Sequence, residues 1–368
     1  MELATLARDY QDFYAPAYAV RLGRDDLMRD LLVAVSQVEV DLELGKASRF
    51  SFTVTDCYSH KLHAFKTGRG ADVLSLLTFG AEIEMCLGYG DAKSMPTLVS
   101  GTITEITTNF PDAGAPELAV SGYDHGFALT FGKNSRTWSK ARDSDAAHEI
   151  ASFNNLNAKI ETTKEPHAQI EQNHEGDWQF LKKLADRNHF ELYVDERKTL
   201  HFGPPNDKAT AVVRLVYGEG LLSFRPEANL AGQISQVEVY GWNPKTKQAF
   251  IGRASAGEES GLNGKSAGQY LNTFVRDPKK KPTLRLRQPV FTQAEADERA
   301  KAALNERAKQ FLTGEGETIG LPELRPDRNV ELDKLGAPFS KTYYLQQATH
   351  KIDASGYRTR FKVKETGL

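Results

Sequence analysis

The chain has 368 residues, of which 40% are hydrophobic, and this length gives room for two or three domains with real cores. Its 47 basic and 49 acidic residues leave a net charge of -2, which argues against a general nucleic-acid-binding protein, because such proteins are usually strongly basic. The two cysteines, Cys57 and Cys86, form no CxxC pair and no zinc spacing, so a reducing compartment is the simpler interpretation.

Short strands dominate residues 1–135. The segments 33–44 and 48–56 alternate between apolar and polar residues, as half-buried strands do. The segments 97–110 and 117–124 form a predicted hairpin around a turn that is rich in proline and glycine. Many short strands at spacings of about 10 residues predict a barrel or sandwich, and we assign residues 1–135 to a first β-barrel.

Residues 136–205 change character and predict a small inserted α/β domain. Residues 144–155 and 176–189 have helical spacing of apolar residues, and Asp177 is a candidate cap of the second helix. Two short strands follow as a hairpin, and two prolines close the segment. Residues 206–228 return to strand, and we expect them to complete the first barrel.

Residues 229–368 predict a second β-barrel. Residues 292–312 predict a helix, with a capping box of Thr292 and Glu295 and a C-terminal cap at Gly314. Its apolar face is mostly alanine, which suits close packing on a sheet. Residues 256–282 are rich in glycine and lysine, and we interpret them as a long loop, mobile or bound to a partner.

A weak internal repeat relates two parts of the chain. Residues 81–124 and 328–365 both run strand, glycine turn, strand, turn, strand. A true duplication would give two similar barrels, although the strand–turn order that all β-meanders share could also produce this pattern. The fold class that we predict is therefore α+β and mainly β, with two barrels and a small α/β insertion.

The last predicted strand carries a row of cations on one face. A turn at residues 353–356 precedes it, and period-2 alternation separates its apolar and cationic residues. The apolar face holds Tyr357, Thr359, Phe361 and Val363, and the opposite face holds Arg358, Arg360, Lys362 and Lys364. These four cations could form a nucleic-acid groove, a partner surface or an ordinary solvated face.

The sequence contains no recognisable catalytic, metal or cofactor motif. His148 and Glu149 lack the second histidine of a metalloprotease motif, and the glycine-containing segments GRGAD and GEGET are interpreted as turns. We therefore predict no catalytic residue, no metal ligand and no cofactor. The start lacks the features of a signal peptide, and no apolar stretch of about 18 residues exists, so we expect no membrane insertion.

Several segments, in order along the chain, resemble the phage late control gene D family of baseplate hub proteins. Residues 14–56 resemble the opening of that family, and residues 80–106 resemble its next strands. Residues 177–205 are similar to its inserted domain, and residues 343–365 to its closing hairpin. A further segment, at residues 233–250, resembles the start of its second barrel. The same module forms the N-terminal part of VgrG spike proteins.

The resemblance implies a structural protein without catalysis. Hubs of this family are trimers at the end of a contractile tail tube, as in phages and extracellular contractile injection systems. Each chain would carry two tube-protein-like barrels. A trimer would then present six barrels to the sixfold inner tube and keep the threefold symmetry of the spike. The implied partners are further copies of the chain, the inner tube protein, a separate spike protein and other baseplate components. The protein would assemble in the cytoplasm and then become part of the particle.

The resemblance also bears on the cationic strand. A ring of barrels must contact its neighbours and line a lumen, so the four cations suit a contact with tube, spike or lumen, and a solvated face is the alternative. Two other functions stay open: a tail-associated enzyme that cleaves glycan or peptidoglycan, and a carbohydrate-binding β-protein.

Overall fold

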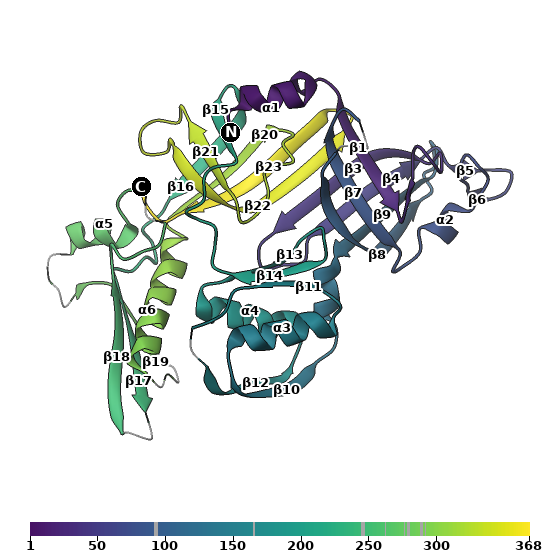
Figure 1. Ribbon diagram of the computed structural model, residues 1–368. Helices are drawn as coiled ribbons and strands as arrows, with labels where there is room; N and C mark the ends of the chain where they lie inside the picture. Colours follow the sequence, from purple (N-terminus) through teal and green to yellow (C-terminus); the bar gives the residue numbers. More distant parts are fainter. Residues whose placement is uncertain are drawn as a thin grey trace.

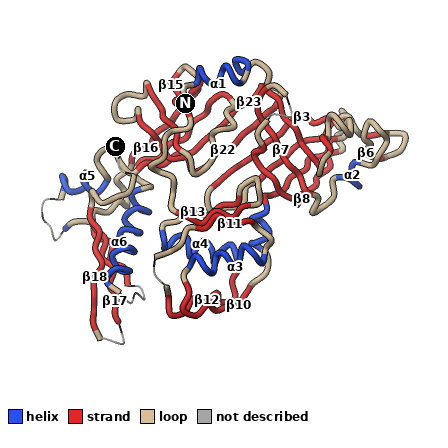
Figure 2. Tube along the Cα trace, in the orientation of Figure 1, coloured by secondary structure: helices blue, strands red, loops and turns tan. Residues whose placement is uncertain are grey.

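The computed structural model of the protein describes residues 1–91, 95–164, 166–243, 247–261, 263–275, 277, 280–287, 290 and 292–368. It is mainly β, and Figures 1 and 2 show two adjoining barrels above, an inserted α/β domain below them and a separate wing of strands and helices at one side. The predicted fold class is confirmed. No described helix is long and apolar enough to cross a membrane.

The first barrel is an open one of six antiparallel strands in the order β1-β7-β8-β9-β4-β3. Its described residues form no ladder between β1 and β3, but the Tyr18 hydroxyl of β1 donates to the Val35 carbonyl of β3. One apolar core fills it, with Phe50, Phe52 and Met85 fully buried. The strands are β1 (Pro16–Leu22), β3 (Ala34–Glu43), β4 (Arg49–Thr55), β7 (Glu82–Tyr89), β8 (Thr97–Asn109) and β9 (Glu117–Asp124).

The second barrel is closed, because its last strand β23 pairs back with β22. The order is β22-β21-β15-β16-β20-β23. Its core includes Tyr343, Phe361 and Leu332. The strands are β15 (Val213–Tyr217), β16 (Gly220–Ala228), β20 (Leu312–Ile319), β21 (Asn329–Asp333), β22 (Lys341–Asp353) and β23 (Gly356–Glu365).

The expectation that residues 206–228 complete the first barrel is wrong. β15 pairs with β21, and β16 pairs with β20, so both strands belong to the closed barrel. Val213, Leu215 and Leu221 are buried in that second core. Alternation along a strand indicates that one face is buried, but it contains no information about which neighbour it pairs with.

The two barrels are continuous through one strand pair. β3 and β22 pair antiparallel from Val38 opposite Ile352 to Glu43 opposite Gln347. The meanders β7-β8-β9 and β21-β22-β23, which carry the weak repeat, have the same antiparallel order, and their central strands β8 and β22 both have 13 residues. Each barrel is therefore built around one long central strand.

The inserted α/β domain has its own core beneath the barrels. Its second helix begins at Asp177 with Gly176 as N-cap, so the predicted cap lies one residue inside the helix. The Asp177 carboxylate instead accepts hydrogen bonds from Arg136, Gln172 and Asn134 at 2.7, 2.8 and 2.9 Å. The elements are β10 (Asn134–Ala141), α3 (Asp143–Phe153), β11 (Asn157–Ile160), β12 (His167–Glu175), α4 (Asp177–Asn188), β13 (Glu191–Val194) and β14 (Thr199–Gly203).

The wing, residues 229–311, leaves the second barrel between β16 and β20 and is not part of it. A three-stranded sheet in the order β18-β17-β19 packs one face on α6. Added side chains at Gly241 and Gly252 would meet this packing, and a Cβ at Gly252 would lie 2.1 Å from the Ala296 backbone. The elements are β17 (Gln236–Asn243), β18 (Gln248–Ser255), α5 (Ala267–Phe274), β19 (Thr283–Arg287) and α6 (Gln293–Ala308).

Three local predictions for this part of the chain need correction. α6 ends at Ala308 rather than residue 312, and Gly314 lies inside β20 rather than at a helix cap. The segment GEGET lies in the same strand and is not a turn. Residues 256–282 are not a bare loop, because they contain α5, and Ser266 and Ala267 are buried where α5 packs on the second barrel. Thr292 does cap α6, accepting from the Glu295 amide.

Short elements complete the chain at its start and around the first barrel. They are α1 (Leu3–Asp9), η1 (Gln11–Phe13), β2 (Asp25–Asp26), β5 (Tyr58–Ser59), β6 (Ala64–Phe65), α2 (Val73–Leu76) and η2 (His125–Thr130).

Candidate partner interface

β23 has the alternation that its sequence predicts. Tyr357, Thr359, Phe361 and Val363 are buried, and the four cations lie on the opposite side of the strand. Phe361 and Val363 belong to the core of the second barrel, whereas Tyr357 packs with the core of the first. The structure therefore brings Arg358, Arg360, Lys362 and Lys364 together as one column on the barrel surface.

The neighbouring strand β20 supplies acidic partners for the middle of this column. Arg360 lies opposite Glu317 with a 3.0 Å ion pair, and Lys362 lies opposite Glu315 at 3.5 Å. Gly314 and Gly316 of β20, which alternate with these glutamates, face inward. A Cβ at Gly316 would lie 2.4 Å from the Phe361 ring, so this ring occupies the space. Both ion pairs are exposed, and such pairs stabilise a fold by about 0–1 kcal/mol each.

The two ends of the column differ from its middle. Arg358 lies between Ile319 of β20 and Lys351 of β22 and has no ion pair with a described residue. Lys364 is half-buried, and this burial lowers the pKa of its ammonium group, with Glu191 acting in the opposite direction. The four residues are thus two neutralised cations flanked by two that are not.

The cationic column is one part of a larger polar surface. The outer faces of β16, β20, β23, β22, β3, β4, β9 and β8 follow one another in the sheet order and cross both barrels; we call this surface the eight-strand face. It carries both signs of charge, with Glu315 and Glu317 on β20, the four cations on β23 and Asp41 on β3, and β22 lies between β23 and β3. On β3, Asp41 accepts hydrogen bonds from Gln347 and Thr349 of β22, at 2.8 and 2.7 Å.

Two hollows of about 470 and 400 Å³ lie on this face. Both are lined by Arg225 of β16, Glu315 of β20 and Lys362 of β23. The hollows are polar and hold both signs of charge, so the face does not attract a polyanion as a basic groove would.

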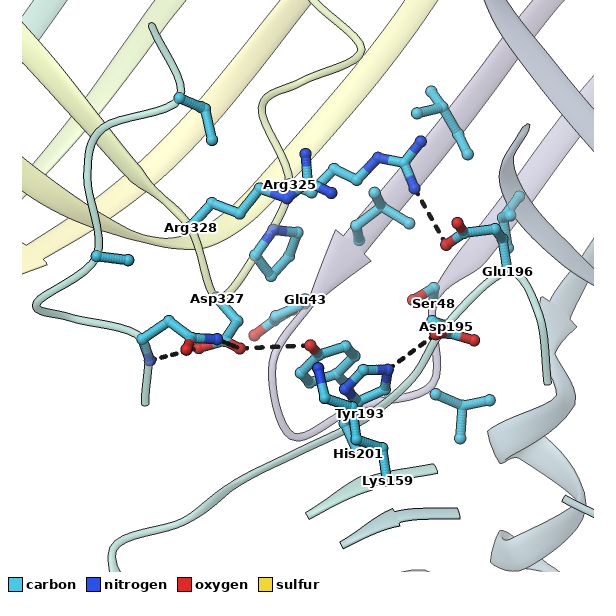
Figure 3. Close-up of a pocket in the computed structure, with 18 of the residues that line it drawn as sticks. Glu43, Ser48, Lys159, Tyr193, Asp195, Glu196, His201, Arg325, Asp327 and Arg328 are labelled. Atoms are coloured by element: carbon cyan, nitrogen blue, oxygen red, sulfur yellow. Dashed lines mark hydrogen bonds and ion pairs between the residues drawn. The ribbon is translucent and has the colours of Figure 1, made fainter. Parts of the chain in front are cut away.

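A separate cavity of about 400 Å³ lies where the inserted domain meets both barrels. Figure 3 shows Tyr193 and His201 side by side in it, with Asp327 on one side and Asp195 on the other. The rings stack at 4.3 Å, and His201 contacts Asp195 at 2.8 Å. Burial opposes ionisation of Asp195, but hydrogen bonds from His201 and two backbone amides lower its pKa to about 2.

Asp327 joins three segments at this cavity. Its carboxylate accepts from Tyr344 of β22 at 2.7 Å, from the Asn206 amide at 2.9 Å and from Tyr193 of the inserted domain at 3.3 Å. Arg325 binds Glu196 at 3.1 Å and the Thr97 carbonyl at 2.9 Å. These polar groups hold the inserted domain against the barrels, and sequence analysis missed them because Asp327 and Arg325 reach Tyr193, Asn206, Glu196 and Thr97 across more than 100 residues of sequence.

Two other histidines, His350 and His125, contact hydroxyl groups away from this cavity. His350 is fully buried, and its two ring nitrogens contact the Leu324 carbonyl and the Tyr357 hydroxyl, each at 2.9 Å. Burial lowers the pKa of His350 to about 3, so the ring is neutral at physiological pH. Ser100 contacts His125 at 3.3 Å. Within the described ranges, no group of three or more His, Cys, Asp or Glu residues is placed to hold a metal ion.

The model of the Alg8 N-terminal domain family matches residues 27–354, which is most of the chain. The chain belongs to the Alg8 N-terminal domain family. The description of this family names a domain and no reaction. No curated protein matches the chain.

Solved structures agree on the fold of this family member. A tail protein from Neisseria meningitidis is similar over 96% of this chain and 97% of its own, with a TM-score of 0.69 and 15% identity. A component of the E. coli type VI secretion system is similar over 94% of this chain and 76% of its own, with a TM-score of 0.57 and 12% identity.

A Francisella PdpA–VgrG complex is similar over 99% of this chain and 55% of its own, with a TM-score of 0.53 and 12% identity. At these identities the likeness establishes the fold. The resemblance to phage tail and VgrG-like proteins, expected from the sequence, is confirmed at that level.

Proposed function

We propose that the protein is a non-enzymatic baseplate hub of a contractile tail-like particle. Three copies form a ring that joins the sixfold inner tube to a threefold spike. The observation that carries this proposal is the eight-strand face, which spans two adjoining barrels and ends at a free strand edge on each side.

The first free edge belongs to β16. This strand pairs with β20 along most of its length, but on its other side it pairs with β15 only at Gly220 and Leu221. Among the described residues, positions 223–228 therefore have no paired strand on that side. Arg225, Glu227 and Pro226 lie on this edge, and charges and proline are the usual protection of an edge against unspecific pairing.

The second free edge belongs to β8. β7 pairs with β8 only up to Thr102, whereas β9 pairs with it up to Asn109. In the described part of the chain, residues 105–109 thus have one strand neighbour, and Thr107, Thr108 and Asn109 are exposed. The two free edges lie on opposite sides of the joined barrels (Figure 1).

A contact between β16 of one copy and β8 of the next uses both edges. Such a contact is heterologous, and it closes into a ring when the rotation between copies allows it. The eight-strand faces of successive copies would then form one continuous sheet around the axis. Three copies bring six barrels together, and the mixed charges of the face, including Arg360 and Lys362, would line the passage.

We infer that the protein acts by assembly rather than catalysis. Asp327 joins the inserted domain to the second barrel, Asp195 and His201 bond each other within the inserted domain, and the His350 ring is buried in the core. The partners that we propose are the inner tube, the spike and other baseplate components. The location that we propose is the cytoplasm during assembly and then the finished particle.

Adjacent proline substitutions in β8 test the ring. Successive residues of a strand direct their amides to opposite sides, so one of Thr107→Pro and Thr108→Pro removes an amide from the free edge, and the other removes a bond to β9. We expect the edge variant to remain folded and to lose the trimer. The other variant is the matched control and should lose stability. Mass photometry and circular dichroism measure both properties.

A wild-type protein that is monomeric at high concentration, with and without its spike, would contradict the hub proposal. Cleavage of peptidoglycan by the purified protein would instead support the enzyme alternative, and binding to a glycan array by a monomer would support the carbohydrate-binding one.

A further inference from the structure

The three-stranded sheet of the wing leaves one face uncovered. α6 covers the face with Val237, Val239 and Ala254 and lies on the side of the inserted domain, where Lys164 pairs with Glu298 at 2.8 Å (Figure 1). In the described part of the chain, no helix or strand covers the other face. The cross-strand register places Glu238, Tyr240 and Trp242 of β17, Ile251 and Arg253 of β18, and Arg285 and Arg287 of β19 on it. The same register adds the smaller residues Gln236, Ala249, Ser255 and Thr283 to this face. We call it the arginine–aromatic face.

This composition differs from an ordinary solvated face. Gln236, Ser255 and Thr283 lie at one end of this face, and the rest of it carries Trp, Tyr, Ile and three arginines. Tryptophan, tyrosine and arginine are the residues that dominate binding energy at protein interfaces. Trp242 is 53% exposed, so a large apolar ring lies in water in this chain.

The charge of the face is positive. Three arginines accompany one acid, and Glu238 contacts two of them, Arg285 at 3.1 Å and Arg253 at 3.7 Å. Glu238 also accepts from the Tyr240 hydroxyl at 2.8 Å. Arg287 has no ion pair with a described residue. An arginine guanidinium matches a carboxylate in a bidentate fork, so this face favours a partner with carboxylates.

The position of the arginines defines the form of that partner. Arg285 and Arg287 lie two residues apart on β19, hence on one face at a spacing of about 6.8 Å. Carboxylates at alternate residues of an extended chain have the same spacing. β19 pairs with β17 on one side, and among the described residues it has no strand on the other. A further strand can therefore be added at this edge.

We propose that the wing binds an extended acidic segment of a protein partner, which adds to β19 as a fourth strand and pairs its alternate carboxylates with Arg285 and Arg287. β19 is a better acceptor than the β18 edge, because β18 contributes only Arg253 to this face. Apolar residues of the partner would cover Trp242 and Ile251. This binding is independent of ring formation, because the wing lies outside the eight-strand face.

A charge-reversal experiment tests this proposal. The probes are a fluorescent peptide of alternating Glu and Val residues and a matched peptide of alternating Lys and Val residues, and fluorescence anisotropy with the full-length protein measures binding. We expect the wild-type protein to bind the acidic peptide about tenfold more tightly than the basic one, with a preference that falls with salt. The double variant Arg285→Glu, Arg287→Glu should reverse the preference.

The matched control reverses two cations elsewhere. Arg360→Glu with Lys362→Glu changes the net charge equally on β23 and should leave the preference for the acidic peptide unchanged. Equal binding of both peptides by the wild-type protein would overturn the proposal. So would displacement of the acidic peptide by an oligothymidylate, which would indicate a single-stranded nucleic acid as the ligand. Because the wild-type protein itself carries the test, a variant that misfolds does not leave the outcome open.

Discussion

The protein displays two cationic sheet faces, and they differ in what lies beside the cations. On β23, the neighbouring strand β20 places Glu317 and Glu315 opposite Arg360 and Lys362. On the wing, Arg253 and Arg285 share a single glutamate, Glu238, and Arg287 has no ion pair with a described residue. The first face is neutralised within the chain, and the second keeps a surplus of positive charge.

The difference shows that the chemistry of a sheet face is a property of neighbouring strands. Four cations in a row along one strand are conspicuous in the sequence, yet half of them are matched by a strand that lies more than 40 residues earlier. The wing arginines are spread over two strands and become one surface only through the register of β17 with its neighbours. The charge counted along one strand therefore overestimates the net positive charge of the β23 face and underestimates that of the wing face.

Substituting the glycines that allow close packing beneath each face should have the largest effect on stability. Gly316→Val puts a branched side chain where the Phe361 ring lies, and we expect a loss of about 3 kcal/mol or more in the free energy of unfolding, because a closed barrel cannot move the ring aside. Urea denaturation followed by circular dichroism measures it.

Gly252→Val is the equivalent change in the wing, where the new side chain would meet the Ala296 backbone. It should separate α6 from the wing sheet and leave the barrels folded. Hydrogen exchange can locate the loss. If Gly252→Val unfolded the barrels as well, the wing and barrel would form one cooperative unit, and the two faces could not be compared separately.

Neutralising the column on β23 should have a moderate effect on assembly and a small one on folding. With Arg358, Arg360, Lys362 and Lys364 all changed to Gln, we expect a loss of no more than about 1 kcal/mol, because the two ion pairs are exposed. Attachment to tube or spike should be impaired, since complementary charge aligns partners. Electron microscopy of particles from cells with this variant checks the result, and normal particles with normal delivery would show an ordinary solvated face.

Changing the acid of the wing face should have the smallest effect on stability. Glu238→Gln removes the carboxylate that competes for Arg253 and Arg285, so the fold should change by under about 0.5 kcal/mol while affinity for the acidic peptide rises severalfold. Fluorescence anisotropy of the peptide measures the rise. Unchanged affinity would indicate that these two arginines do not contact the probe.

The pH dependence of that face follows from the same group. Hydrogen bonds from Tyr240 and Arg285 hold the pKa of Glu238 below its usual value. A depressed pKa means that the stabilisation is present at neutral pH and is lost only as the pH falls through the lowered value. Peptide affinity measured at pH 8 and at pH 6, where the glutamates of the peptide also stay ionised, should therefore agree, whereas a rise at pH 6 would mean that Glu238 is already protonated there.

The sequence predicted local features well where one strand or helix determines them. The alternation of β23, the N-cap at Thr292 and the α/β character of residues 136–203 depend on neighbours within a few positions. It assigned β15 and β16 to the wrong barrel because Val213 and Leu221 bury equally well in either core. From the sequence, Gly314 and Gly316 are assigned to a turn, because glycine is more common in turns than at strand positions covered by an aromatic ring. In the structure, the Phe224 ring lies over Gly314 and the Phe361 ring over Gly316.

The candidate sites were less predictable than the fold. Residues 256–282 have a loop-like composition, but the side chain of Ser266 forms a capping box with Gln269, and Ala267 fits the barrel core. Asp327 binds Tyr193 and Asn206, which are more than 100 residues away. Such contacts depend on the complete tertiary structure.

The wing begins and ends at adjacent points of one barrel. Ala228 at the end of β16 lies opposite Leu312 at the start of β20, and the Asn229 amide donates to the Phe311 carbonyl at 2.9 Å. A segment whose ends meet in this way can be exchanged for another of different length, as an insertion between two strands of a hairpin. The contacts of α5 with the barrel and of α6 with α4 set the limits of such an exchange. The wing is thus an exchangeable insertion, whose replacement would change what the protein binds on this side without altering the paired strands of the two barrels.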